Sequence, residues 1–249
     1  MESVTGTRER IVNAGAELLR RNGYTGTGVK QIVEAANAPF GSLYHFFPGG
    51  KEQLGEEVIR TSGMMYLALF EIFFADEPDL IHGIEACFAS AAETLKATDY
   101  ADACPIATVA LEVASTNEKL RIATADVFTA WIETGAEKLG KYGLGPESAR
   151  RLTIALVNSL EGAFVLSRSL RNTEALDVAG ASSVAFARTL LASCVVWTVR
   201  TVLTTHEASS GKRGRRASPP LRRYRSAPES PHRTNAGRWR GRPRRPPVR

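Results

Sequence analysis

Apolar residues recur every three or four positions along most of the chain, which is the spacing of a helix with one buried side. Near the N-terminus the pattern occupies two short stretches, with apolar residues at Ile11, Ala14, Leu18 and Leu19 and then at Val29, Ile32, Val33 and Ala36. Thr7 and Thr27 stand where side chains cap helices, and Gly23 follows the first stretch. Pro39 suits the first position of a third helix, which Pro48-Gly49-Gly50 ends. The pattern therefore predicts three short helices within residues 1–50.

Longer helices follow from Lys51 onward. The same periodicity predicts them over residues 51–75, 79–98, 104–115, 117–142, 146–171 and 175–205. No strand-like alternation competes with this pattern, and no internal repeat is present. We therefore predict an all-α fold, with three short N-terminal helices followed by a larger helical part.

Charge is distributed unevenly along the 249 residues. The formal net charge is +6, but residues 207–249 hold 14 of the 32 Lys and Arg and only 2 of the 26 Asp and Glu. The remaining 18 basic and 24 acidic residues give residues 1–206 a net charge of −6. The tail is mostly Arg, Pro, Gly and Ser, so we expect it to be disordered. The basic total is thus a property of the tail rather than of the helical part.

The sequence argues against several classes of protein. The cysteines Cys87, Cys104 and Cys194 are far apart, which disfavours both disulfides and a zinc site. No phosphate-binding loop, nucleophile elbow or zinc-protease motif occurs, so we predict no cofactor, no metal and no enzymatic activity. No leader opens the chain, and its longest apolar run, residues 189–199, is shorter than the roughly 20 residues of a membrane span. We expect a cytoplasmic protein without a membrane partner.

The third short helix has an unusual composition, seen in the stretch 37-NAPFGSLYHFFPGGKEQL-54. At about 100° per residue, Leu43, Phe46 and Phe47 share one side of this helix. The opposite side carries small or hydrogen-bonding residues: Gly41, Ser42, Tyr44 and His45. Because an interior glycine costs a helix about 1 kcal/mol relative to alanine, close approach of another molecule is the expected reason for Gly41.

Two short helices joined by a tight turn describe a helix-turn-helix over about residues 28–47. In that motif the second helix lies in the major groove of DNA, where hydroxyl, phenol and imidazole groups contact base edges and phosphates. Residues at the starts of neighbouring helices are placed to hold further phosphates. The candidate DNA contacts are Thr27, Gly41, Ser42, Tyr44, His45 and Lys51.

A longer segment that contains these helices, residues 8–59 with Gly23-Tyr24 and 41-GSLYHFF-47, resembles the DNA-binding domain of the TetR family of transcriptional repressors. The continuation 48-PGGKEQL-54 and the later segment 104-CPIATVALEVAS-115 are similar to the LmrA/YxaF-like branch. The resemblance implies a DNA-binding domain over residues 1–50 and an effector-binding and dimerisation domain over residues 51–206. The tail, residues 207–249, has no counterpart.

The family binds a palindromic operator as a homodimer, so the resemblance implies a repressor that a small effector releases. Carried over onto this chain, the DNA contacts fall on Thr27, Ser42, Tyr44, His45 and Lys51, with Pro39, Phe40 and Gly41 completing the face. One position departs from the family. Phe40 stands where Lys or Arg is common, so a cationic contact is missing, and the ring is expected to touch a thymine methyl or to weaken binding.

In the family, the last two long helices pair across a two-fold axis into a four-helix bundle. Both helices of this chain carry small and apolar residues that would allow close approach. The residues predicted at the dimer interface are Leu152, Leu156, Ser159, Gly162, Leu191, Cys194, Val195 and Thr198. The alternative is that these residues form core within one chain.

An effector site is expected among the central helices, because release requires a ligand that prefers one of two conformations. The predicted lining is Met64, Leu67, Phe70, Phe88, Phe128, Trp131 and Phe164. Charged residues are sparse among these positions, which favours an apolar or aromatic effector. The alternative is that the aromatic residues form a solid core.

Two other functions compete with a DNA-binding regulator. One is a helical enzyme with its pocket in the larger domain, against which the missing acid–base and metal motifs argue. The other is a non-specific nucleic-acid binder that acts through the basic tail. Binding to a short palindrome that persists without the tail distinguishes the regulator from the latter.

Overall fold

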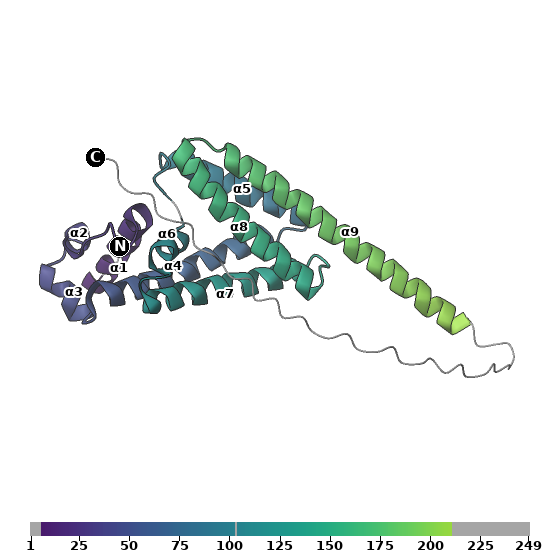
Figure 1. Ribbon diagram of the computed structural model, residues 1–249, viewed down its shortest axis with the longest axis horizontal. Helices are drawn as coiled ribbons and strands as arrows, with labels where there is room; N and C mark the ends of the chain where they lie inside the picture. Colours follow the sequence, from purple (N-terminus) through teal and green to yellow (C-terminus); the bar gives the residue numbers. More distant parts are fainter. Residues whose placement is uncertain (1–5, 103, 211–249) are drawn as a thin grey trace, which may run out of the picture. The chain divides into compact units, whose positions relative to one another are not determined.

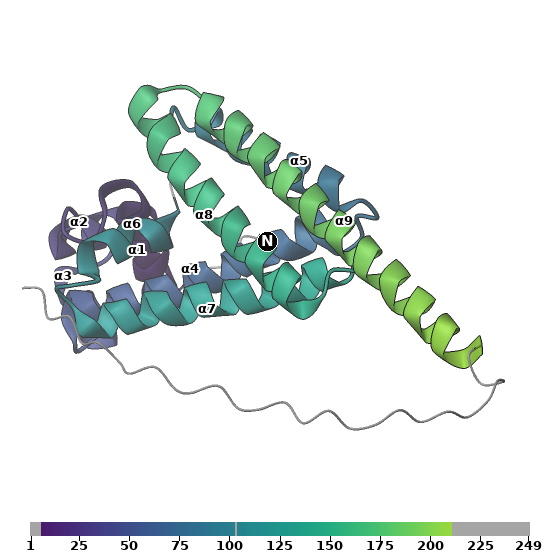
Figure 2. The same ribbon diagram turned by 45° about the vertical axis from the view of Figure 1, so that its right-hand side comes forward.

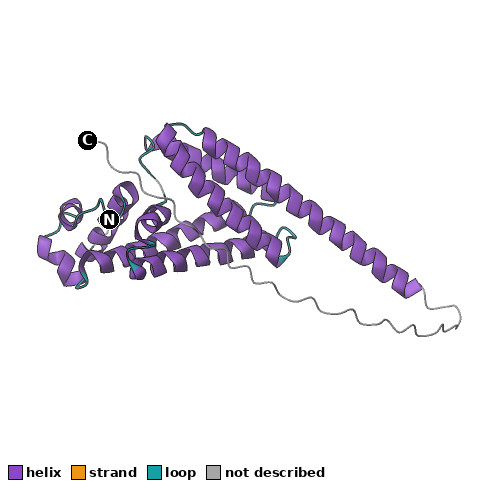
Figure 3. Ribbon diagram, viewed as in Figure 1, coloured by secondary structure: helices purple, strands orange, loops and turns teal. Residues whose placement is uncertain are grey.

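The computed structural model describes residues 6–102 and 104–210, and their side chains as far as Ser193. These residues form helices joined by short connections, with no strand among them (Figures 1 and 3). The all-α prediction is therefore confirmed. In chain order the helices are α1 (Thr7–Asn22), α2 (Val29–Ala35), α3 (Phe40–Phe46), α4 (Gly50–Phe74), α5 (Leu80–Ala97), α6 (Pro105–Val113), α7 (Glu118–Gly140), α8 (Pro146–Leu170) and α9 (Glu174–Ser210).

The predicted helix boundaries lie within a few residues of these bounds, except that α9 continues beyond residue 205 to Ser210. Local signals explain the agreement. Gly23 ends α1 with a φ of 74° and its N–H donates to Leu19 O, the positive φ that glycine adopts most readily. The side chains of Asp79 and Asn117 accept from backbone N–H groups at the starts of α5 and α7. The tail from residue 211 lies outside the described residues.

Three predicted helix starts are wrong by one residue. Gly6, Gly28 and Pro39 are the N-cap residues of α1, α2 and α3, so Thr7 is the first residue of its helix and Pro39 precedes the first turn of α3. Thr27 does not cap α2, because its hydroxyl donates to the carbonyls of Gly23 and Leu18 instead. A tertiary interaction has thus replaced the local cap that the sequence suggested.

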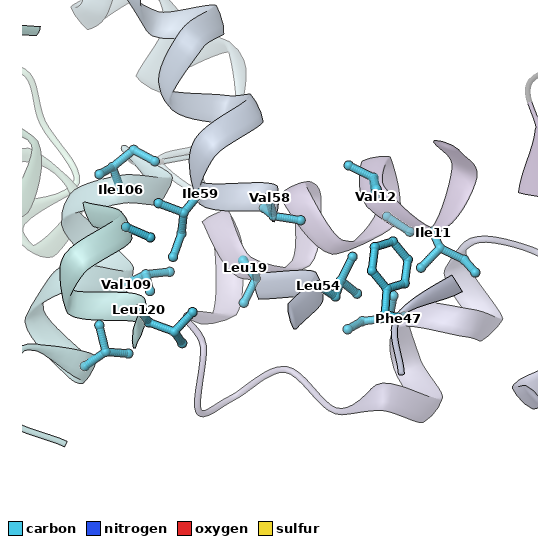
Figure 4. Close-up of a cluster of buried hydrophobic side chains, with 14 of the residues drawn as sticks. Ile11, Val12, Leu19, Phe47, Leu54, Val58, Ile59, Ile106, Val109 and Leu120 are labelled. Carbon is cyan, nitrogen blue, oxygen red and sulfur yellow. The ribbon is translucent and has the colours of Figure 1, made fainter. Parts of the chain in front are cut away.

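The first cluster of buried apolar side chains, which we call the head core, joins the three short helices to α4, α6 and α7. Figure 4 labels ten of its members: Ile11, Val12, Leu19, Phe47, Leu54, Val58, Ile59, Ile106, Val109 and Leu120. Leu43 of α3 is fully buried in the same cluster. Since fully burying such a side chain contributes about 1.5–3 kcal/mol, this shared core fixes α3 firmly relative to α4 and α6.

The second cluster, the body core, is formed by α4, α5, α7, α8 and α9. Its buried members include Phe74, Ile84, Phe88, Leu139, Leu152, Leu156, Leu176, Val184 and Ala187. The segment Glu174–Ser193 of α9 has a mean hydropathy of 1.3 and is long and apolar enough to cross a membrane by length and composition. Leu176, Val184 and Ala187 of this segment pack in the body core.

α4 and α7 lie side by side along much of their length (Figures 1 and 2). A Cβ at Gly63 of α4 would lie 2.5 Å from the Val127 methyl groups of α7, so glycine is required for this approach. The indole of Trp131 donates to the Gly63 carbonyl at 2.8 Å. Beyond this crossing α4 continues from the head core into the body core, so one helix belongs to both.

Candidate functional site

The outward side of α3 is a mixed aromatic and polar surface. Phe40 and Tyr44 are 56% and 48% exposed, and their ring centroids lie 6.0 Å apart. Gly41 and His45 are also exposed, while Ser42 is half-buried. The predicted face of α3 therefore exists, because Leu43 and the neighbouring Phe47 anchor the opposite side in the head core.

Gly41 has no explanation within the chain. A Cβ at this position would meet no heavy atom within 4 Å, so alanine would fit and would favour the helix. Gly55 differs, since a Cβ there would lie 3.0 Å from the Tyr24 ring. The open space above Gly41 is where a second molecule can approach the backbone closely.

Two predicted DNA contacts occupy positions that the sequence did not suggest. Thr27 is fully buried, and its hydroxyl is used by the bonds to Gly23 and Leu18, at 2.7 and 3.2 Å, so no side-chain oxygen remains at the surface for a phosphate. Lys51 is partly buried, with its ammonium 4.2 Å from the centroid of the Tyr24 ring. Burial lowers the pKa of Lys51, and the nearby Glu112 opposes this shift.

Arginine side chains that the sequence did not single out hold the helix-turn-helix in place. Arg10 of α1 donates from Nε to Ala36 O at 3.0 Å, which ties α1 to the turn before α3. Arg8 pairs with Glu57 of α4 at 2.5 Å and lies 5.2 Å from the centroid of the Phe47 ring. Since these partners lie 26 to 49 residues away in sequence, no local pattern could have revealed them.

A cavity of about 400 Å³ lies between α4, α5, α7 and α8, close to α1 and α6. Its wall is mostly apolar and rich in aromatic rings. The aromatic lining residues are Tyr66, Phe70, Phe73, Phe74, Phe88, Trp131 and Phe164. Four of the seven predicted lining residues, Phe70, Phe88, Trp131 and Phe164, are therefore at this cavity.

The other three predicted lining residues lie elsewhere. Met64 is 65% exposed on the outer side of α4, and its neighbour Met65 lines the cavity in its place. Leu67 and Phe128 pack against the head core. A single position along a helix turns the side chain by about 100°, which accounts for the exchange of Met64 for Met65.

Ionisable groups gather at one end of the cavity. The guanidinium of Arg20, from α1, forms an ion pair with the carboxylate of Asp102, and Arg21 Nε lies 3.9 Å from the same residue. Tyr66 faces this end, and burial raises its pKa to about 12. Both members of the Arg20–Asp102 pair line the cavity.

Glu161 of α8 is the other carboxyl group in the wall. Burial raises its pKa to about 7, and a hydrogen bond with the Cys104 thiol opposes that shift. The pKa of Cys104 is well above its ordinary value, through burial and then through the nearby Glu161. Burial alone raises the pKa of Cys87 to about 11, so both thiols stay protonated and poorly nucleophilic near neutral pH.

Three sets of contacts join the cavity wall to the DNA-binding helices. The Arg20–Asp102 pair connects α1 to the segment before α6. The Glu112 carboxylate of α6 accepts from the backbone N–H groups of Tyr24 and Thr25, at 3.1 and 2.6 Å, in the turn before α2. α4 is continuous from Gly50, just after α3, to the cavity-lining Phe70 and Phe74. These contacts physically connect the cavity wall to α1 and to the start of α4, just after α3.

The predicted dimer residues fall on two different sides of their helices. Leu152 and Leu156 are buried in the body core of a single chain, whereas Gly162 is exposed and a Cβ on it would meet nothing within 4 Å. Ser159 and Leu191 are half-buried. Cys194, Val195 and Thr198 lie beyond the described side chains.

A second, solvent-facing stripe runs along α8 and α9. Its members are small or apolar and recur at helical spacing: Asn158, Gly162, Val165, Leu166 and Ser169 on α8, and Val178, Ala181, Ser182, Ala185 and Thr189 on α9. Val165, Leu166 and Val178 are 54–59% exposed. We call this set the outer stripe; the sequence did not separate it from the buried stripe, because both repeat every three to four residues.

Among the described residues no group of three or more His, Cys, Asp and Glu side chains could hold a metal ion. Glu77 and His82, which pair at 2.6 Å, lie on the surface near the start of α5. Neither faces the cavity. The cavity wall offers a ligand apolar surface together with hydrogen-bonding and charged groups.

Comparison with known proteins matches both parts of the chain. Residues 11–58 match the family of bacterial regulatory proteins of the TetR type, and residues 81–182 match the C-terminal domain of LmrA/YxaF-like transcriptional regulators. The HTH-type transcriptional regulator YxaF of Bacillus subtilis is 33% identical over 167 residues, covering 67% of this chain and 87% of its own. LmrA of the same organism, also an HTH-type transcriptional regulator, is 30% identical over 170 residues, covering 68% and 90%. The crystal structure of a regulatory protein TetR from Rhodobacter sphaeroides has the same fold, with a TM-score of 0.65 and 22% identity over 73% of this chain and 97% of that one.

Proposed function

Since the chain belongs to the TetR family of transcriptional regulators, and within it to the LmrA/YxaF-like group, we propose that it is a cytoplasmic repressor released from a palindromic operator by a small aromatic effector. DNA binding by a helix-turn-helix and regulation rather than catalysis follow from membership of the family. The observation that carries the finer proposal is the outward side of α3, where Gly41 leaves open space beside exposed aromatic and polar side chains.

In the proposed complex, α3 lies in the major groove with Gly41 against the DNA. Tyr44 and His45 reach phosphates, Ser42 contacts a base edge or phosphate, and Phe40 contacts a thymine methyl. Thr27 supports the motif from within, because its hydroxyl is buried. Pro39 and Lys51 flank the face. Because the Lys51 ammonium lies over the Tyr24 ring, the proposal assigns a phosphate contact to the backbone amides at the start of α4 instead.

We place the two-fold axis of the dimer against the outer stripe of α8 and α9. Dimerisation would bury the exposed side chains of Val165, Leu166 and Val178, and Gly162 would allow the helices of the two chains to approach closely. The buried Leu152 and Leu156 support these helices from the side of the body core. This proposal keeps Gly162 from the predicted interface and adds the exposed residues beside it, in the arrangement of a four-helix bundle.

Effector binding in the cavity is proposed to move the two heads of the dimer relative to each other. A ligand that fills about 400 Å³ contacts α4 at Tyr66 and Phe70 and lies against the Arg20–Asp102 pair. α4 begins just after α3, and Arg20 belongs to α1, which packs against α3. A ligand with different affinity for the two arrangements shifts the population between them, which changes the spacing of the two α3 helices on the operator.

The direct test of DNA recognition is to select bound fragments from a random DNA pool with the full chain and to sequence them. We expect a palindrome, and we expect Tyr44→Ala to lower affinity for it by about 1–3 kcal/mol, the range of a charge-assisted hydrogen bond together with lost packing. The matched control is Leu111→Ala, which removes an 80% exposed apolar side chain on α6, away from α3. Unchanged affinity for Tyr44→Ala would show that α3 is not the reading helix.

The effector half of the proposal is tested by scoring aromatic compounds for release of the selected operator. Phe164→Ala should change the concentration needed for release while leaving operator affinity without ligand intact, since Phe164 lines the cavity and packs against the body core rather than the head core. Release only by hydrophilic metabolites would contradict the assignment of this cavity as the effector site.

A non-specific binder acting through the tail is the remaining alternative. The tail carries 14 of the 32 basic residues, so it would add salt-dependent affinity for any DNA. Sequence preference that survives removal of residues 207–249 would exclude this alternative.

A further inference from the structure

The cavity holds one carboxyl group that has no cation to balance it. Of the two acidic residues in the wall, Asp102 pairs with Arg20, and Arg20 is the single cationic side chain among the described lining residues. Glu161 forms no ion pair with any described cationic side chain, and its hydrogen-bonding partner is the neutral Cys104 thiol. An ionised carboxylate in such surroundings lacks most of the stabilisation that water or a counter-ion provides.

The rest of the wall is suited to a flat aromatic body. Seven aromatic side chains surround the cavity, with Tyr66 and Trp131 rings 5.9 Å apart at its polar end. Faces of such rings attract cations as well as apolar groups. An anionic ligand would face Glu161 without an available cation, because Arg20 is already paired.

We propose that the effector is an aromatic cation, such as an aromatic amine, whose positive group is bound by the Glu161 carboxylate while its rings fill the aromatic part of the cavity. This inference rests on the proposed function of the cavity as the effector site and names the chemistry of that effector. The cation supplies the counter-charge that the wall lacks. Glu161 is then the residue that determines specificity for charged over neutral ligands.

Binding of a cation should depend on pH in a way that neutral binding does not. Burial places the pKa of free Glu161 at about 7, so a cation must displace a proton from it at lower pH. Of the titratable and charged groups that face it from the other elements, Tyr66, Cys87 and Cys104 stay protonated over the same range, and Arg20 is paired with Asp102. Affinity for the cation should therefore fall about tenfold from pH 8 to pH 6.

The experiment uses the full chain and two fluorescent tricyclic probes, the cation 9-aminoacridine and the uncharged acridone. Each is titrated against the wild type, Glu161→Gln, and the control Glu147→Gln, which makes the same change at an exposed position of the same helix. We expect Glu161→Gln to weaken 9-aminoacridine binding by about 10- to 100-fold, the range for loss of a hydrogen bond to a charged group, and to remove its pH dependence. Acridone binding should be equal in all three proteins, and thermal unfolding confirms that each variant is folded.

Each result decides a separate point. If Glu161→Gln binds 9-aminoacridine as tightly as the wild type, the inference is overturned, although acridone binding would leave the cavity as an aromatic ligand site. If neither probe binds the wild type, the aromatic character of the site is overturned as well. If both probes bind and only the cation releases the operator through Glu161, the inference and the proposed function both hold.

Discussion

Replacing Thr27 by valine tests whether this residue supports the helix-turn-helix or contacts DNA. Valine keeps the shape of threonine and removes only the hydroxyl. That hydroxyl is fully buried and donates to Gly23 O at 2.7 Å and to Leu18 O at 3.2 Å. Because one proton serves both carbonyls, the substitution removes the equivalent of one neutral hydrogen bond and leaves a buried acceptor with one partner fewer.

The expected loss of stability is about 1–2 kcal/mol, since a neutral hydrogen bond contributes about 0.5–1.5 kcal/mol and an unsatisfied buried group costs somewhat more. For a protein of this size, each kcal/mol corresponds to roughly 2–4 °C in Tm. Operator affinity, measured well below the transition, should remain within about twofold of the wild type, because no exposed atom of Thr27 is lost.

The assay is urea unfolding followed by circular dichroism at one fixed protein concentration, because dimerisation makes stability depend on concentration. Operator binding is measured in parallel by fluorescence anisotropy. The matched control is Ser42→Ala, which removes a hydroxyl from the outward side of α3. It should show the opposite pattern, with affinity reduced about three- to tenfold and stability changed by less than about 0.5 kcal/mol.

A Thr27→Val protein of normal stability that has lost operator affinity would refute this reasoning. The hydroxyl would then have to leave its carbonyl partners in the complex and contact a phosphate, as the sequence alone suggests. A loss of stability with intact affinity supports the buried role.

Three further predictions concern other parts of the chain. Gly162→Arg should yield monomers that bind the operator poorly, whereas the control Gly140→Arg, at another glycine with nothing within 4 Å, should remain dimeric in light scattering; a dimeric Gly162→Arg protein would contradict the interface. Because the folded protein raises the pKa of Glu161 from 4.5 to about 7, this group favours folding most below pH 4.5 and loses that contribution as pH rises through about 7. The free energy of unfolding should therefore fall between pH 5 and pH 8 by up to about 3 kcal/mol through this group, and Glu161→Gln should remove the fall in urea titrations. Truncation after residue 206 should leave a folded dimer that selects the same operator, and aggregation of the truncated chain would show that the boundary is misplaced.

The sequence predicted the helices and the outward side of α3 because both depend on local signals. Helical spacing, Gly23 and the Pro48-Gly49-Gly50 break act over a few residues, and the structure follows them closely. Thr27 was misjudged for the opposite reason. A local pattern shows that a threonine precedes a helix, but the partner of its hydroxyl, Leu18, depends on how α1 packs.

Only part of the cavity lining was predicted, because a local pattern does not show which residues meet in the folded chain. Aromatic residues on a helix indicate a buried side, but not whether that side meets a solid core or a cavity, as Phe128 and Trp131 illustrate. Glu161 and the Arg20–Asp102 pair carry no local signal at all, because their partners are 57 to 82 positions away in the sequence. The dimer prediction meets the same limit at Leu152, which is buried in its own chain: α8 has two sides of small or apolar residues, and periodicity does not say which one faces its own chain.

The head core has a consequence for how operator preference can change among related regulators. Moving residues 1–50 into a relative would separate Tyr24 from Gly55 of α4. The two residues pack together, and Leu120 of α7 also lies close to Gly55. A larger residue at position 55 would collide with the Tyr24 ring, so Tyr24 and Gly55 have to be kept together. On the outward side of α3, by contrast, a Cβ at Gly41 would meet no heavy atom within 4 Å, and the rings of Phe40 and Tyr44 are about half exposed. Hybrid regulators should therefore be built by exchanging single side chains on that surface, which leaves the packing between the short helices and α4 unchanged.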